Sequence, residues 1–272
     1  MSQDIGYPKF LRDTAVSRLD ENTWEAELTD DWSIGGVANG GYSMATAARA
    51  LSESLDHKDP LSITGHYLSR VEPGKALLEI EKLNIGKSVS TALLKFIQGG
   101  EERIRFTSCF TDFAKSKGDT LREVEAPDFP PIEECIAMPY KEGFTPVLEK
   151  QIDRKFTPHS DWWDEDRPRA RACLDAYYAW PGGEDIDLFS VIFFLDTMSP
   201  PIFNRLGSRG WVPSLELTVH LKQTPTSGPL RMRGKTYFIT SGFLEEDDEI
   251  WDSEGNLIGQ ARQMAKLRMP KT

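Results

Sequence analysis

SITGHYLSRVEPG, residues 62–74, returns in outline 154 residues later as ELTVHLKQTPTSG, residues 216–228. His66 corresponds to His220 at this offset, and a glycine closes both segments. Self-similarity at a fixed offset is the sequence signature of a repeated structural unit. Because the offset is more than half of the 272 residues, we expect two halves of the same architecture rather than a long array.

Both segments continue as strand-like runs, and one helical pattern precedes each of them. GlyGly at 99–100 and GluGly at 254–255 lie between alternating β-rich runs and predict hairpin turns. The apolar positions of the first predicted helix are Met44, Ala48, Leu51 and Leu55. Those of the second are Leu188, Val191, Ile192, Leu195 and Met198. The second helix is apolar nearly all round, so it should be buried, and Pro200 should end it.

Each half therefore consists of a strand segment, one buried helix and a run of antiparallel strands. This order predicts an α+β architecture in which each sheet wraps around a helix. The polar, proline-bearing segment 116–145 predicts a linker. We expect an N-terminal domain over residues 1–115 and a C-terminal domain over residues 146–272.

The composition narrows the class of protein. A net charge of -11 and a pI near 5.0 disfavour binding to nucleic acid or to an anionic membrane. Cys109, Cys135 and Cys173 are widely spaced, which argues against a disulfide scaffold and for a reducing compartment. The N-terminus lacks the apolar core of a signal peptide, and no apolar run is long enough for a membrane span. We expect a cytoplasmic protein.

Several segments together resemble a known family. They are ANGGY at 38–42, HYLSRVEPG at 66–74, PSLELTVHL at 213–221, GFLEEDDEIWDSEGNLIG at 242–259 and RQMAKLR at 262–268. In order and spacing the chain resembles the double hotdog thioesterases, the type II acyl-CoA thioesterases and their thioesterase-like relatives. The resemblance covers nearly the whole chain. It implies two tandem hotdog domains, an acyl-CoA substrate, no metal or other cofactor, and a homodimer or higher homo-oligomer.

Glu216 is the first candidate catalytic residue. Leu215, Leu217, Val219 and Leu221 alternate on one predicted strand face, and Glu216 lies on the other face. Periodicity alone predicts a solvated glutamate there. The resemblance instead implies that Glu216 takes the position of an acid, usually Asp, that activates water between the two halves.

Gln263 is the single polar side chain on a small, apolar strand face, so its amide should have a hydrogen-bond partner. It could be structural, but the resemblance implies that Gln263 holds the attacking water or the thioester carbonyl. The third residue implied by the resemblance is a Thr or Ser on the preceding strand. Thr240 and Ser241 both qualify, and either could equally be a turn hydroxyl.

Two glycines open the first predicted helix, in VANGGY at 37–42. Unpaired N–H groups at a helix N-terminus stabilise an oxyanion well, and glycine allows a substrate to approach them. In this interpretation Asn39 caps the helix, Gly40 and Gly41 provide space, and the N–H of Gly41 or Tyr42 points at the carbonyl. The alternative is that the glycines only form a tight entry turn.

The halves differ at the candidate positions. The offset carries Glu216 to Ser62 and Gln263 to Cys109, and neither replacement can act as the same kind of base or amide. The second helix opens with GGEDID at 182–187, whose carboxylates would repel an oxyanion. We therefore expect one working site per chain.

Two other classes compete with a thioesterase. GYSMA at 41–45 resembles a nucleophile elbow around Ser43, but the chain lacks the alternating strands and helices of an α/β-hydrolase. A hotdog hydratase is set aside, because neither helix opening offers the required His. The serious alternative is a double hotdog protein that binds acyl-CoA or another acyl ligand without catalysis. Glu in place of Asp and a degenerate first half would fit it.

Overall fold

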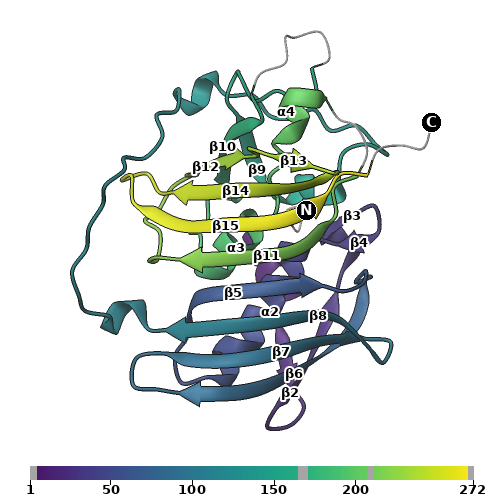
Figure 1. Ribbon diagram of the computed structural model, residues 1–272, viewed down its shortest axis with the longest axis vertical. Helices are drawn as coiled ribbons and strands as arrows, with labels where there is room; N and C mark the ends of the chain where they lie inside the picture. The colour runs from purple at the N-terminus through teal and green to yellow at the C-terminus, as the bar shows by residue number, and fades with distance from the viewer. Residues whose placement is uncertain (1–4, 165–170, 208–210, 269–272) are drawn as a thin grey trace.

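The strands of both halves form one continuous antiparallel sheet in the computed structural model, which describes residues 5–164, 171–207 and 211–268 (Figure 1). The strand order is β1-β2-β6-β7-β8-β5 through the first half and β11-β15-β14-β12-β10-β9 through the second. β3 and β4 form a separate hairpin, and β13 pairs with β14. The double hotdog fold implied by the resemblance is confirmed, with the two sheets joined into one.

The bounds of the elements are as follows. The strands of the first half are β1 (Val16–Arg18), β2 (Thr23–Leu28), β3 (Ser33–Ile34), β4 (Val37–Ala38), β5 (Asp59–Tyr67), β6 (Gly74–Ile85), β7 (Ser90–Gln98) and β8 (Glu101–Thr111). Those of the second half are β9 (Asp153–Phe156), β10 (Cys173–Ala179), β11 (Ser214–Leu221), β12 (Leu230–Lys235), β13 (Ile239–Thr240), β14 (Phe243–Trp251) and β15 (Leu257–Lys266). The α-helices are α1 (Tyr7–Asp13), α2 (Gly40–Ser54), α3 (Leu188–Phe194) and α4 (Ile202–Leu206). The short 3-10 helices are η1 (Asp30–Trp32), η2 (Phe113–Lys115), η3 (Ile132–Glu134) and η4 (Val147–Gln151).

The sequence repeat meets itself at the centre of the sheet. β5 pairs with β11 in antiparallel register, and Thr64 lies directly opposite Thr218. Their hydroxyl oxygens are 2.9 Å apart, and the two residues are separated by 154 positions, the offset of the repeat. A pseudo-two-fold axis therefore passes between them, and it relates one half of the chain to the other.

A β-bulge lies at the same place in each half. The register of β11 against β15 shifts between Ser214 and Glu216, and the register of β5 against β8 shifts between Pro60 and Ser62. One extra residue reverses the alternation of side chains beyond the bulge. Leu217, Val219 and Leu221 are buried as predicted, but Leu215 is 37% exposed because it is the extra residue.

Helices α2 and α3 pack together behind the sheet as Figure 1 shows it. α2 is buried nearly all round, with Met44, Ala45, Ala47 and Ala48 fully inaccessible to solvent. Sequence periodicity predicted only one apolar face for it. The difference arises because α3 and the strands β5, β6 and β7 cover different sides of α2, and the small alanine side chains allow that close approach.

α3 ends at Phe194, four residues before the predicted end of the helix. The chain then turns toward the N-terminus of α2, where the side-chain amide of Asn39 donates a hydrogen bond to the backbone carbonyl of Asp196 (2.9 Å). The early end of α3 brings Asp196 to the junction of the two halves. Among the described residues, no helix has the length and apolar character needed to cross a membrane.

Aromatic side chains join the halves beside this junction. Phe10 of α1 packs against Trp180 and Phe193 of the second half, with ring centroids 5.2 and 5.1 Å apart. Trp32 meets Phe193 edge-on at 5.3 Å. Such contacts add to the stability that apolar burial provides, so they help to hold the two halves together. The N-terminal helix α1 was not expected from the sequence.

Candidate active site

A cavity of about 590 Å³ lies between the two halves. Its wall combines the N-terminal end of α2, the end of β5, the residues that follow α3 and one end of β11 and β15. The connection between β8 and β9 contributes Met138, Phe144 and Leu148, so much of the wall is apolar. The polar side chains used below are those of Asn39, Tyr67, Asp196, Ser214, Glu246 and Gln263. We call this space the inter-half cavity.

Asp196 projects its carboxylate onto the N-terminus of α2. The backbone N–H of Gly41 donates a hydrogen bond to Oδ2 (2.6 Å), and the side-chain amide of Asn39 donates a second one to the same oxygen (2.9 Å). Desolvation by the surrounding protein raises the pKa of Asp196 to about 7, while these donors act in the opposite direction by stabilising the charged form. A carboxylate with this pKa is matched to proton transfer near neutral pH.

The two glycines of ANGGY make room for this arrangement. A Cβ on Gly41 would lie 2.7 Å from Cβ of Asp196 and 2.9 Å from the carbonyl oxygen of Phe193. A Cβ on Gly40 would lie 2.8 Å from the hydroxyl of Tyr67 and 2.9 Å from Oδ2 of Asp196. Any side chain at either position would displace the groups that surround it. The glycines therefore admit the second half of the protein to the helix end.

The N–H groups that the sequence interpretation offered to an oxyanion are already engaged. Asn39 caps α2 as predicted, since its side-chain oxygen accepts a hydrogen bond from the N–H of Tyr42 (2.9 Å). The N–H of Gly41 is bonded to Asp196. The structure thus gives the N-terminus of α2 a protein carboxylate as its partner, and neither of these two N–H groups points freely into the cavity.

Gln263 lines the inter-half cavity, and its amide is held at both ends. The hydroxyl of Ser214 donates to its Oε1 (2.7 Å), and its Nε2 donates to Oε2 of Glu246 (2.5 Å). The sequence-based expectation that this amide has partners is therefore confirmed. With these two bonds made, one N–H of the amide remains for a further acceptor.

Glu246 is a buried carboxyl on β14, directly opposite Gln263 on β15. Burial raises its pKa to about 8, and the nearby charge of Asp196 acts in the same direction. Asp248, two residues further along the inner face of β14, also has its pKa raised well above the usual range by burial and by Glu246. Asp196 and Glu246 of the site, and Asp248 beyond the cavity lining, thus hold their protons more strongly than exposed carboxyl groups do.

The structure does not bring Glu216 into the inter-half cavity. It lies opposite His66 on the outer face of the sheet, where it accepts a hydrogen bond from the hydroxyl of Thr218 (2.5 Å). Glu216 is on the face that its alternation with the buried Leu217 predicts. The bulge moves Ser214 instead: without it Ser214 would share the outer face with Glu216, and with it Ser214 pairs with the buried Ala265 and reaches the inner face. Ser214, not Glu216, therefore meets Gln263.

Thr240 and Ser241 also lie outside the site. Both are exposed at the turn between β13 and β14, and Ser241 has a φ of 53°. They are turn hydroxyls, which was the alternative interpretation of that segment. Neither belongs to the lining of the inter-half cavity.

Four polar residues of the site were missed by the sequence interpretation: Tyr67, Asp196, Ser214 and Glu246. Tyr67 lies in the segment HYLSRVEPG, but no role was assigned to it. Asp196 carries a signal that could have been used, since it is a lone acid at the end of the apolar run FSVIFFL. Glu246 was hidden in the acidic run LEEDDE, where charge alone predicts a solvated strand. Ser214 was concealed by the bulge, because strict alternation assigns it to the wrong face.

The N-terminus of α3, the counterpart of the N-terminus of α2, is occupied by a carboxylate of its own half. Asp187 caps α3 by accepting a hydrogen bond from the N–H of Ser190 (2.6 Å), and it also forms an ion pair with Arg49 of α2 at 3.3 Å. Arg49 further lies over the ring of Phe189. No counterpart of the Asp196 arrangement is formed there.

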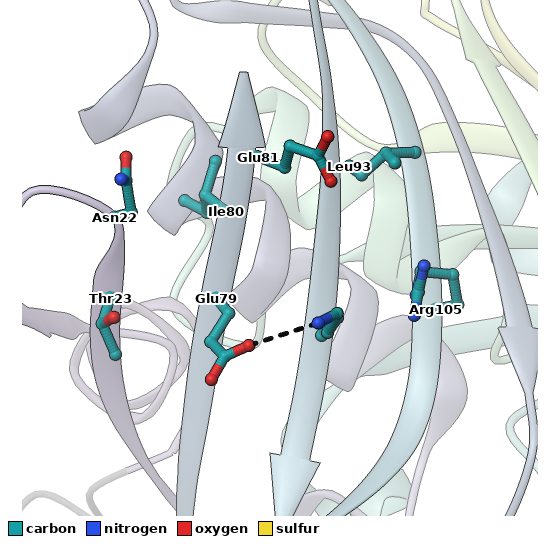
Figure 2. Close-up of a pocket in the computed structure, with 8 residues that line it drawn as sticks. Asn22, Thr23, Glu79, Ile80, Glu81, Leu93 and Arg105 are labelled. Carbon is teal, nitrogen blue, oxygen red and sulfur yellow. Dashed lines mark ion pairs between the residues drawn. The ribbon is translucent and has the colours of Figure 1, made fainter. Parts of the chain in front are cut away.

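A second hollow, of about 220 Å³, lies on the sheet of the first half (Figure 2). Its floor carries Glu79, Glu81 and Arg105, and Glu79 pairs with Lys95 at 3.6 Å. Arg105 is engaged by Glu102. This hollow is a solvated, charge-paired strand surface. In the described part of the chain, no group of three His, Cys, Asp or Glu side chains could hold a metal ion.

The comparisons with known proteins agree with this fold. The acyl-CoA thioesterase N-terminal domain family matches residues 28–111, and the acyl-CoA thioesterase C-terminal domain family matches residues 132–267. The chain therefore belongs to the acyl-CoA thioesterase family of double hotdog proteins.

Individual relatives span the whole chain. A Thermobifida fusca protein assigned to thioesterase II is 26% identical, covers 96% of this chain and 97% of its own, and superposes with a TM-score of 0.88. The acyl-CoA thioesterase II TesB2 of Mycobacterium marinum has the same fold, with 14% identity, a TM-score of 0.78 and coverage of 96% and 99%. An uncharacterized protein of Mycobacterium tuberculosis is 23% identical over 265 residues, 90% of each chain.

Proposed function

We propose that this protein hydrolyses an acyl-CoA thioester in the inter-half cavity, and that Asp196 is the general base. One observation carries the proposal: a carboxylate whose pKa is raised to about 7 by burial lines a largely apolar cavity, and the same cavity is lined by Gln263, whose amide is bonded at both ends. A base must lie beside the water that it activates, and its pKa should be close to the working pH. Asp196 lines the cavity that would hold this water, and burial raises its pKa to about 7.

In the proposed reaction Asp196 removes a proton from a water molecule as its oxygen adds to the thioester carbonyl. The remaining N–H of Gln263 can hold that water or the carbonyl, because Ser214 and Glu246 fix the orientation of the amide. The tetrahedral intermediate then breaks its C–S bond, and the thiolate of coenzyme A leaves with the electron pair. The proton on Asp196 is available to that thiolate.

The lining of the cavity fits the two parts of an acyl-CoA molecule. Apolar side chains such as Phe144, Trp162 and Phe203 offer an environment for an acyl chain. Arg70 and Arg268 also line the cavity and are exposed, so they offer positive charge to phosphate groups on a protein whose net charge is -11.

The alternative is a protein that binds acyl-CoA or another acyl ligand without catalysis. It rested on Glu216 in place of an aspartate, on an unidentified hydroxyl and on a degenerate first half. Asp196 and Ser214 supply an aspartate and a hydroxyl within one cavity. Both hypotheses predict binding of acyl-CoA, so turnover separates them.

The test is release of free thiol from short, medium and long acyl-CoA substrates by the wild type, Asp196→Asn and Glu216→Gln. We expect kcat of Asp196→Asn to fall by about 10²- to 10⁴-fold, the usual contribution of a general base. Glu216→Gln should retain turnover, because the outer-face carboxylate is outside the cavity. For the wild type, kcat/KM should rise as the pH increases through about 7, since the base must be deprotonated.

The opposite pattern, turnover lost in Glu216→Gln and retained in Asp196→Asn, would assign the base to Glu216 instead. Binding of acyl-CoA by the wild type with no turnover at any chain length would establish the binder.

A further inference from the structure

The hydroxyl of Tyr67 is a polar group of the cavity that the proposed reaction does not use. Tyr67 is the last residue of β5, in the first half, and its side chain lines the inter-half cavity. Its hydroxyl oxygen is buried and has no hydrogen-bond partner within residues 5–164, 171–207 and 211–268. A buried hydroxyl without a partner costs stability, so its presence calls for an explanation.

The position of this hydroxyl is defined by Gly40. A Cβ built on Gly40 would lie 2.8 Å from Oη of Tyr67 and 2.9 Å from Oδ2 of Asp196. Both oxygens therefore flank the same point beside the bare α-carbon of Gly40, and both residues line the cavity. A group that accepts a hydrogen bond from the hydroxyl would lie near the carboxylate.

The chemistry of thioester hydrolysis requires a donor at such a place. Negative charge develops on the carbonyl oxygen as water adds, and a preorganised hydrogen-bond donor stabilises it. The N–H groups of Gly41 and Tyr42 are bonded to Asp196 and Asn39, so they do not supply this donor. The hydroxyl of Tyr67 has an O–H to give and no acceptor in the protein.

The charge state of Tyr67 suits this role. Burial raises its pKa well above the usual range, and the carboxylates of Asp196 and Glu216 act in the same direction. The hydroxyl thus keeps its proton throughout the working range, and it donates a hydrogen bond without transferring the proton.

We propose that Tyr67 is a catalytic residue, whose hydroxyl donates to the thioester carbonyl oxygen and stabilises the oxyanion formed when water adds. This inference rests on the proposed thioesterase function. The oxygen of the water forms a bond to the carbonyl carbon, and Asp196 accepts a proton from this water. The π electrons of the carbonyl group move to its oxygen, which accepts the hydrogen bond from Tyr67. The carbonyl then re-forms as the C–S bond breaks and the thiolate leaves. Each half of the protein thereby contributes to the reacting centre, Asp196 from the second and Tyr67 from the first.

The test is Tyr67→Phe, which removes one oxygen atom. Three quantities are measured on the full chain: steady-state release of thiol from acyl-CoA, the thermal midpoint Tm, and the Kd for an acyl-CoA thioether, which lacks the carbonyl. We expect kcat to fall by about 10²- to 10³-fold, as for the loss of one oxyanion donor. Tm should stay the same or rise, because an unsatisfied hydroxyl is removed. The Kd for the thioether should not change.

Tyr7→Phe is the matched control. The hydroxyl of Tyr7 bonds to Asp187 (3.1 Å) at the opposite helix end, away from the inter-half cavity. This variant should lose a little stability and keep the turnover of the wild type.

Two results would overturn the role of Tyr67 and leave the proposed function standing. The first is full turnover by Tyr67→Phe. The second is a loss of turnover that is accompanied by a lower Tm and by weaker binding of the thioether. The second result would indicate a structural hydroxyl. A wild-type protein without turnover on any acyl-CoA would overturn the proposed function and this inference together, so the two failures are distinguishable.

Discussion

The two halves share a backbone at the site but differ in the side chains that it carries. Each central strand has a bulge near its start, with Ser214 at the bulge of β11 and Pro60 at the bulge of β5. Ser214 pairs with Ala265 of β15, and Gln263 lies two residues before Ala265. Pro60 pairs with Phe110 of β8, and Ser108 lies two residues before Phe110, so Ser108 is the counterpart of Gln263. The register thus corrects by one residue the sequence-based match of Gln263 with Cys109.

The position of Glu246 also differs between the halves. Glu246 faces Gln263 in the second half, and Ala92 faces Ser108 in the first. Serine, amide and carboxyl in one half are therefore replaced by proline, serine and alanine in the other. The backbone frame alone does not make a site, and one half supplies both the amide and the two groups that orient it.

The first half still contributes what the second lacks. Its helix α2 offers the N-terminus that receives Asp196, whereas the N-terminus of α3 is occupied by its own Asp187. The two halves therefore have different roles in the site. One half holds the acid and the amide, and the other sets the electrostatic environment of that acid.

The largest effect is expected for Gln263→Ser, which places in the second half the residue type that the first half has at Ser108. We expect kcat to fall by about 10²- to 10³-fold, because a fixed hydrogen-bonding group at the reacting centre is lost. The measurement is steady-state thiol release, with Tm as a check on folding. Gln260→Ser, on the same strand outside the cavity lining, is the control and should retain turnover.

Turnover by Gln263→Ser within a few-fold of the wild type would mean that the amide does not take part. The difference between the halves at this position would then be a matter of packing only.

Much of the fold could be predicted from the sequence. The repeat located the central strands, and the offset found there is the separation of Thr64 and Thr218 across the pseudo-two-fold axis. The hairpin turn at 99–100 is also present, with both glycines at positive φ. These features follow from local patterning, which sequence periodicity reports directly.

The site was less accessible because it depends on a break in that patterning. Gln263 was identified, since a lone amide on an apolar face violates the expected pattern. Ser214 was not, because a bulge changes the face of every residue beyond it and leaves no mark in the alternation of neighbours. Asp196 depends on where α3 ends, and helix boundaries are the least predictable part of a helix.

Ser214→Ala tests the contribution of the hydroxyl that the first half lacks, and its expected effect is smaller. The hydroxyl donates to Oε1 of Gln263, so its loss frees one end of the amide without removing it. One hydrogen bond is worth about 1 kcal/mol, so we expect kcat to fall about 3- to 10-fold with little change in KM. Ser62→Ala, just beyond the bulge of the first half and outside the cavity lining, provides the matched control. Equal rates for wild type and Ser214→Ala would show that Glu246 alone orients Gln263.

Glu246→Gln has the smallest expected effect on turnover, and its effect on stability depends on pH. The new amide oxygen can still accept the hydrogen bond from Gln263, so kcat should stay within a few-fold of the wild type. The pKa of Glu246 is raised from 4.5 to about 8 in the folded protein. Between these values the unfolded chain releases the proton and the folded protein keeps it, so the free energy of unfolding of the wild type falls as the pH rises.

In Glu246→Gln this titratable group is absent, so its free energy of unfolding does not fall with pH for this reason. Its Tm relative to the wild type should therefore increase as the pH rises from about 4.5 to about 8 and change little above that range. Thermal unfolding of both proteins across this interval measures the difference, with Glu249→Gln, which lies on the same strand outside the cavity lining, as the control. A difference in Tm that is constant with pH would show that Glu246 is ionised throughout. The amide of Gln263 would then be held by a full negative charge, and the second half would differ from the first by a charge as well as by a hydrogen bond.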